Sequence, residues 1–123
     1  MVLLQKKQTK PEEMTMGNIE ERRLAMHSVL EDILGSKNVY FQPPGSAVTK
    51  MHYPCFRYTE DRGSQRYANN KTYNYTQGYQ LMYIDPNPID DIKEELFKRF
   101  SYISYDRQYV ADNLNHDVYT IFI

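Results

Sequence analysis

The three histidines are the first residues to consider for catalysis or metal binding, because imidazole titrates near neutral pH and ligates metals. They are His27, His52 and His116. Only His116 lies among acids, with Asp112 and Asp117 in the string DNLNHD. That string could hold a metal, but Asp and Asn side chains that bond their own backbone are also what a tight hairpin needs. No pair of histidines has metal-ligand spacing, so we favour a turn.

Cys55 is the only cysteine and therefore the one candidate for a nucleophilic thiol. A reactive thiol needs a neighbouring base and a setting that lowers its pKa. The flanking Tyr53, Pro54 and Phe56 indicate instead a thiol that packs within a strand. The sequence has no nucleophile elbow, phosphate-binding loop or dinucleotide fingerprint. We therefore expect a protein that is not an enzyme and has no catalytic residue, metal or cofactor.

Residues 59–77 interleave basic and aromatic side chains in a way that could contact nucleic acid. Arginines can track phosphates and tyrosines can stack on bases. However, Glu60 and Asp61 lie in the same segment, and the whole chain carries 15 basic against 16 acidic residues, a formal net charge of −1. Sequence-specific binding is therefore disfavoured. A hairpin that faces a channel carrying DNA remains an alternative.

The composition is that of one small domain. A chain of 123 residues is long enough for a single hydrophobic core. It has 12 tyrosines and no tryptophan, and tyrosine suits strands and half-buried interfaces. Its apolar runs are too short for a signal-peptide core or a membrane span, so we expect no membrane partner.

The clearest helix is predicted over residues 18–34, where apolar side chains recur at three- and four-residue steps. Asn18 and Glu21 have the spacing of a capping box, and Gly35 can end the helix in a left-handed conformation. In residues 1–17 the apolar side chains follow neither the period of a helix nor that of a strand. They are predicted to be a plain tail or an arm packed on a neighbouring subunit.

Strands and a second helix follow. The predicted strands are Asn38 to Gln42, Met51 to Tyr58, a segment from near Tyr73 through Asp85, Ser101 to Ala111, and Val118 to Ile123. Pro54 cannot donate to a ladder, which restricts it to an edge, a bulge or the start of a strand. Helix 88–99 is predicted to follow a cap at Asn87, and residues 112–117 are predicted to be a hairpin turn.

The order helix, strand, hairpin, helix, hairpin predicts an α+β fold. We expect a mixed or antiparallel sheet of about four to five strands with two main helices packed on one face. The segment 59–77 is predicted to be a long protruding hairpin with Arg62 and Arg66 at its tip. Residues 18–123 then form a single domain, and residues 1–17 form an N-terminal extension.

Near the C-terminus the segments YDRQY (105–109) and ADNLNHDVY (111–119) resemble the end of small tail-terminator and tail-completion proteins of long-tailed bacteriophages. These are neck proteins, which join head to tail. Residues 34–44, the string MHYPC (51–55) and residues 79–86 resemble the same group. The string DNLNHD is the most specific part of the resemblance.

The resemblance implies a virion structural protein that forms a ring, commonly six-fold, at the head-proximal end of the tail. Such a ring caps the tail tube and docks onto the head–tail connector or stopper protein, with DNA passing through its lumen. The place of action would be the virion neck, after synthesis in the host cytoplasm. The alternatives are a head-completion or stopper protein and, in another class, a small nucleic-acid-binding module.

Contacts with neighbouring subunits or with the lumen are expected from the polar hairpin and from the string DNLNHD. Exposed hairpins supply such contacts at little cost to the fold. The residues expected to make them are Arg62, Arg66, Tyr67, Tyr73, Tyr75, Asn113 and His116.

Overall fold

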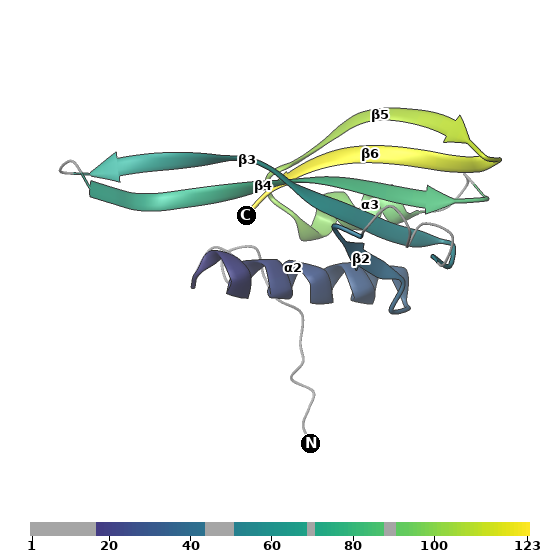
Figure 1. The fold of residues 1–123 in the computed structure, drawn as a ribbon, viewed down its shortest axis with the longest axis horizontal. Helices are drawn as coiled ribbons and strands as arrows, with labels where there is room; N and C mark the ends of the chain where they lie inside the picture. Colours follow the sequence, from purple (N-terminus) through teal and green to yellow (C-terminus); the bar gives the residue numbers. More distant parts are fainter. Residues whose placement is uncertain (1–16, 44–50, 69–70, 88–90) are drawn as a thin grey trace, which may run out of the picture.

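The computed structural model describes residues 17–43, 51–68, 71–87 and 91–123, without the side chains of residues 64–75. These residues form two helices and one mixed five-stranded sheet, which confirms the predicted α+β fold (Figure 1). The strands lie in the order β2-β3-β4-β6-β5. The elements are α2 (Ile19–Leu34), β2 (Val39–Phe41), β3 (Cys55–Ala68), β4 (Lys71–Asp85), α3 (Ile92–Arg99), β5 (Ile103–Ala111) and β6 (Leu114–Phe122).

Helix α2 begins and ends as predicted. The Asn18 side chain accepts from the Glu21 N–H at 2.8 Å, and the Glu21 carboxylate accepts from the Asn18 N–H at 3.1 Å. At the other end Gly35 is left-handed, with φ 78°, and its N–H donates to the Glu31 carbonyl at 2.8 Å. The buried side chains of the helix are those of Arg22, Met26, Val29 and Leu30.

The strand predicted at residues 38–42 is the short strand β2, which pairs in parallel with β3. Strand β3 begins at Cys55 rather than at Met51, directly after Pro54. Because proline has no N–H to donate, it fits just before the first paired residue. The strand also runs further than predicted and ends at Ala68.

Strands β3 and β4 pair antiparallel, and their register shifts between Glu60 and Gly63. At this bulge the Arg62 carbonyl approaches the opposite strand so closely that a Cβ added at Gly78 would lie 2.3 Å from its oxygen. Only glycine fits there, since real Cβ atoms do not come so close to a carbonyl. The predicted protruding tip includes residues 69–70, which lie outside the described residues, so the protruding hairpin stays a prediction.

Helix α3 starts later than predicted. Its cap is Asp91 and not Asn87. The Asn87 N–H instead donates to the Asp85 carboxylate at 2.8 Å, which makes a local turn directly after β4. Residues 88–90, which include the predicted first helical position, lie outside the described residues. The predicted end of the helix at Arg99 is confirmed.

Strands β5 and β6 form the predicted hairpin, but its turn is shorter than the string 112–117. Asp112 and Asn113 have φ of 54° and 62°, and β6 already begins at Leu114. Two consecutive left-handed residues make a two-residue type I′ turn, whose twist matches that of the flanking strands. Residues 114–117 belong to β6 because they pair with β5 on one side, and most of them with β4 on the other.

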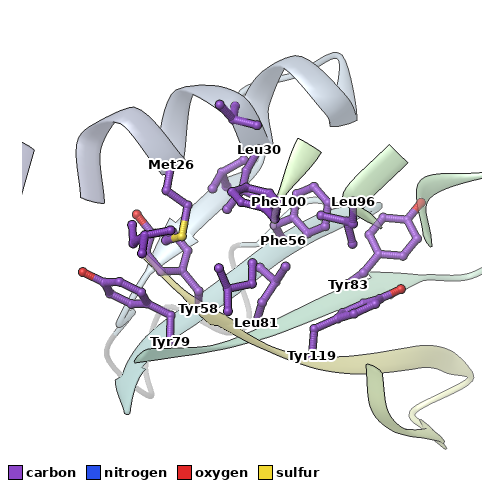
Figure 2. Packing of buried hydrophobic residues seen from close by; sticks show 14 residues of the cluster. Met26, Leu30, Phe56, Tyr58, Tyr79, Leu81, Tyr83, Leu96, Phe100 and Tyr119 are labelled. Atoms are coloured by element: carbon purple, nitrogen blue, oxygen red, sulfur yellow. The ribbon is translucent and has the colours of Figure 1, made fainter. Parts of the chain in front are cut away.

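The core fills the face of the sheet that both helices cover (Figure 2). Its sheet side is rich in tyrosine, and the side chains of Tyr58, Tyr79 and Tyr119 are 0% exposed. The other large members are Met26, Leu30, Phe56, Leu81, Tyr83, Leu96 and Phe100. Three of the tyrosines that the composition assigns to half-buried surfaces are therefore fully buried.

On the other face of the sheet, side chains of the strands themselves cover a smaller apolar group. Cys55, Ile84 and Val118 are buried there, outside the main core. The Tyr109 ring of the edge strand stacks on His116, with centroids 4.6 Å apart and planes at 11°. The stack covers part of that face, and the Tyr109 hydroxyl lies 3.8 Å from the Met82 sulfur, so His116 has a packing role.

Candidate interaction surface

Strand β5 forms one outer edge of the sheet and has β6 as its neighbour within the described residues (Figure 1). The N–H and C=O groups along such an edge are a template for pairing with another chain. A register shift between Tyr105 and Arg107 places a bulge at Asp106. The Asp106 carboxylate accepts from the Ser104 hydroxyl at 2.9 Å and from the Thr120 hydroxyl at 2.5 Å, which fixes the bulge.

Two exposed aromatic side chains lie beside this edge, and we call them the aromatic patch. They are Phe97 of α3 and Tyr105 of β5, which are 45% and 37% exposed. The rings of Phe97 and Tyr105 both contact the buried Tyr119 ring, with centroids 6.4 and 5.3 Å away. The patch is therefore supported by the core. Clustered exposed aromatic side chains are typical of a protein–protein interface.

A groove of about 570 Å³ lies between the start of α3 and strands β5 and β6, and we call it the α3–β5 groove. Its lining residues are Asp91, Lys93, Glu94, Tyr105, Gln108, Asn115 and Asp117. Three carboxylates and one ammonium group give this lining a formal charge of −2. Because Tyr105 also belongs to the aromatic patch, the groove and the patch are continuous.

Contacts among the lining residues hold the groove in shape. The Lys93 ammonium lies 3.8 Å from the centroid of the Tyr105 ring, and the Tyr105 hydroxyl donates to the Asp117 carboxylate at 3.2 Å. Burial, together with that carboxylate, raises the pKa of Tyr105. The Gln108 amide donates to the Asn115 side-chain oxygen. An aromatic ring beside carboxylates favours the binding of a cation. The Tyr105 ring already contacts one, the Lys93 ammonium group.

A second polar cluster lies between α2 and the sheet. The buried Tyr58 hydroxyl contacts Arg23 Nη1 at 2.9 Å and His27 Nδ1 at 2.7 Å. Because a guanidinium can only donate, the hydroxyl accepts from Arg23. The tautomer of His27 that carries its proton on Nε2, towards Glu31, lets the hydroxyl donate to Nδ1. The other ring nitrogen of His27 lies 3.5 Å from the Glu31 carboxylate. Burial lowers the pKa of His27 and raises that of Tyr58. The four groups satisfy one another, which indicates a structural role.

The residues that the sequence singles out for chemistry do not come together. Asp117 lines the groove, whereas the neighbouring His116 ring lies on the opposite face of the sheet. Burial raises the pKa of the Cys55 thiol to about 12, the reverse of what a nucleophile needs. His52 is exposed. Within the described ranges, no group of three or more His, Cys, Asp or Glu side chains is placed to hold a metal ion.

The predicted contact residues lie apart from the aromatic patch. Arg62 is exposed at the bulge of β3, not at the tip where it was predicted. Asn113 is exposed in the β5–β6 turn, and His116 is part of the ring stack. Arg66, Tyr67, Tyr73 and Tyr75 lie on the paired strands β3 and β4, but their side chains are outside the described residues.

The aromatic patch and the groove were not predicted from the sequence, because both depend on strand order. Whether β5 is central or outermost follows from pairing between residues far apart in the sequence. One signal could have indicated an edge. Residues 103–111 (ISYDRQYVA) are polar at most positions on both faces, which is typical of an outer strand.

No family model matches the sequence, and no curated protein is significantly similar to it. Neither helix of the described residues is long and apolar enough to cross a membrane. The function is therefore inferred from the surface at β5 and from the resemblance of short segments.

Proposed function

We propose that this protein is a virion structural protein of a tailed-phage neck. It forms a ring that caps the tail tube and joins it to the head connector, as a tail terminator or tail-completion subunit. The observation that carries the self-association is the outer strand β5 with the aromatic patch beside it. The step from a self-associating subunit to a phage neck depends on the resemblance of residues 105–119 and of the earlier segments.

The two edges of the sheet favour a ring over a simple dimer. Strand β2, at one edge, has three residues and runs parallel to its neighbour, whereas β5, at the other, has nine and runs antiparallel. An interface that joins two different surfaces is heterologous. Repeated heterologous contacts close into a ring when the rotation between neighbouring subunits is a whole fraction of a full turn. A subunit with unlike edges suits this arrangement.

Two alternatives have support of their own. A head-completion or stopper protein would use the same surfaces with a different neighbour. A nucleic-acid contact is favoured by one observation: the Arg107 guanidinium lies 5.7 Å from the centroid of the Tyr109 ring, which stacks on His116. Arginine next to stacked rings can hold a base or a phosphate. The Asp106 carboxylate beside it reduces the local positive charge, so we rank this alternative below the ring.

The proposal is tested by the mass of the purified full chain, measured by light scattering over a range of concentrations, and by negative-stain images. We expect a mass several times 14.7 kDa and rings with a central channel. Phe97→Asp is expected to give monomers, because it places a charge in the aromatic patch. The matched control is Leu24→Asp, at a residue 51% exposed on α2; it should leave the oligomer intact.

A chain that stays monomeric at every concentration, and also in the presence of tail-tube protein, would contradict the proposal. Experiments that capture binding partners distinguish a tail terminator from a stopper protein. A tail terminator binds the tail-tube protein and limits tube length, whereas a stopper binds the connector alone. Retention on DNA at low salt that is lost in Arg107→Ala, without any oligomer, would favour the nucleic-acid alternative.

A further inference from the structure

We propose that the α3–β5 groove and the aromatic patch receive residues 1–10 of a neighbouring copy of this chain, which add along the β5 edge. This inference rests on the proposed function, because it names the contact by which copies associate. Addition of an extended segment to a sheet edge takes its affinity from backbone hydrogen bonds and its specificity from side-chain sites beside the edge.

The charge of the segment complements that of the groove. Residues 1–10 (MVLLQKKQTK) contain Lys6, Lys7 and Lys10 and no acid, a formal side-chain charge of +3. The lining of the groove has a formal charge of −2. Opposite charges on facing surfaces fix the register of a contact and speed its formation. The contact between Lys93 and the Tyr105 ring shows how an ammonium group is held in this groove.

The apolar part of the segment complements the aromatic patch. Val2, Leu3 and Leu4 precede the first two lysines by two to five residues, which is roughly 7–17 Å of extended chain. The aromatic patch adjoins the groove through their shared Tyr105. The three apolar side chains can therefore cover Phe97 and Tyr105 while the lysines lie in the groove.

Helix α2 lies at the side of the sheet away from β5, which suits a contact between neighbouring copies. Residues 1–16 lead into α2, which contacts β2 and β3 at one side of the sheet, whereas β5 is the opposite edge (Figure 1). Four strand spacings separate β2 from β5, roughly 19 Å. A segment that leaves one side of a subunit and docks on the opposite side of the next makes a heterologous contact, the kind that closes rings.

The direct test is disulfide crosslinking in the full chain that carries Leu4→Cys and Phe97→Cys. Cys55 does not compete, because its side chain is 0% exposed. Under mild oxidation we expect a ladder of covalent dimers and larger species on non-reducing gels. The matched control pairs Leu4→Cys with Leu24→Cys, another exposed position, and should give no ladder. A crosslinked monomer alone, or no crosslinking, would overturn the inference.

A charge swap gives a second test. Lys6→Glu with Lys7→Glu is expected to raise the concentration needed for assembly by about tenfold or more. Adding Asp91→Lys and Glu94→Lys to that variant should restore assembly. Asp91 is a safe site because its side chain makes no capping hydrogen bond. Assembly that is indifferent to the first pair overturns this inference and leaves the ring proposal standing, whereas an unmodified chain that never assembles contradicts both.

Discussion

Two glycines constrain this chain for different reasons. A Cβ at Gly78 would meet the Arg62 carbonyl oxygen at 2.3 Å and a ring carbon of Phe122 at 2.9 Å, so the position is limited by space. A Cβ at Gly35 would meet no atom within 4 Å, but its φ of 78° lies where side chains are strained. The first glycine allows β3, β4 and β6 to meet at the bulge, and the second ends a helix.

Substitution of these two glycines by alanine is expected to lower the free energy of unfolding by different amounts. Gly78→Ala is expected to lower the free energy of unfolding by about 2–4 kcal/mol, since the clash is with backbone that the bulge fixes. Gly35→Ala is expected to cost about 1 kcal/mol, the usual cost of a left-handed alanine. Urea denaturation followed by circular dichroism measures both. A Gly78→Ala variant as stable as Gly35→Ala would contradict the described bulge.

His27 makes stability depend on pH. Burial lowers its pKa from the ordinary value of 6.5, whereas Glu31 acts in the opposite direction and Arg23 in the same direction. The unfolded chain therefore binds a proton more readily than the folded one between the two pKa values. The contribution of neutral His27 is complete above about pH 6.5 and is lost as the pH falls towards the folded pKa.

We therefore expect the protein to lose more stability between about pH 7.5 and pH 5 than the variant His27→Gln, which cannot take up a proton. Denaturation curves at a series of pH values measure the difference. The control is His52→Gln, at an exposed histidine, which should follow the unmodified protein. Equal pH dependence in the His27→Gln variant and the unmodified protein would show that His27 is not held neutral.

At the scale of the elements, the sequence predicted correctly those features that depend on interactions between residues close in the chain. The cap at Asn18 and the end at Gly35 are confirmed because their hydrogen bonds lie within four residues. Residues 114–117 were predicted as turn because the string 112–117 is dense in turn-forming residues. They are strand because β6 lies between β4 and β5, and two ladders outweigh the preference of short polar side chains for turns. Strand order, and with it the groove and the patch, could not be predicted from local pattern.

The β5–β6 turn allows a prediction at the same scale. Asn113 occupies the second left-handed position of a type I′ turn, where glycine is also favoured. Asn113→Gly is expected to keep or slightly raise the melting temperature, whereas Asn113→Val should cost about 1–2 kcal/mol because a β-branched residue is strained there. Thermal unfolding of both variants tests this. A tolerated valine would argue against the two-residue turn.

At the scale of the whole molecule, assembly should be visible in stability. A partner that binds only the folded subunit raises the melting temperature as its concentration rises. We therefore expect the melting temperature of the full chain to increase with protein concentration, and that of Phe97→Asp to stay constant. Differential scanning calorimetry over about a hundredfold range of concentration measures this. A constant melting temperature in the unmodified chain would contradict association through the folded surface.

Strand β4 lies at the centre of the sheet, with β3 on one side and β6 on the other. The amides of Tyr79–Ile84 therefore lose their hydrogen bonds and exchange with solvent only when the sheet opens as a unit. We expect them to show the slowest hydrogen–deuterium exchange in the chain. Amides of β2 and β5 should exchange faster, through local opening, which peptide-resolved mass spectrometry can measure. The edge that we propose for assembly is thus also the part of the sheet that can rearrange at the lowest cost to the rest.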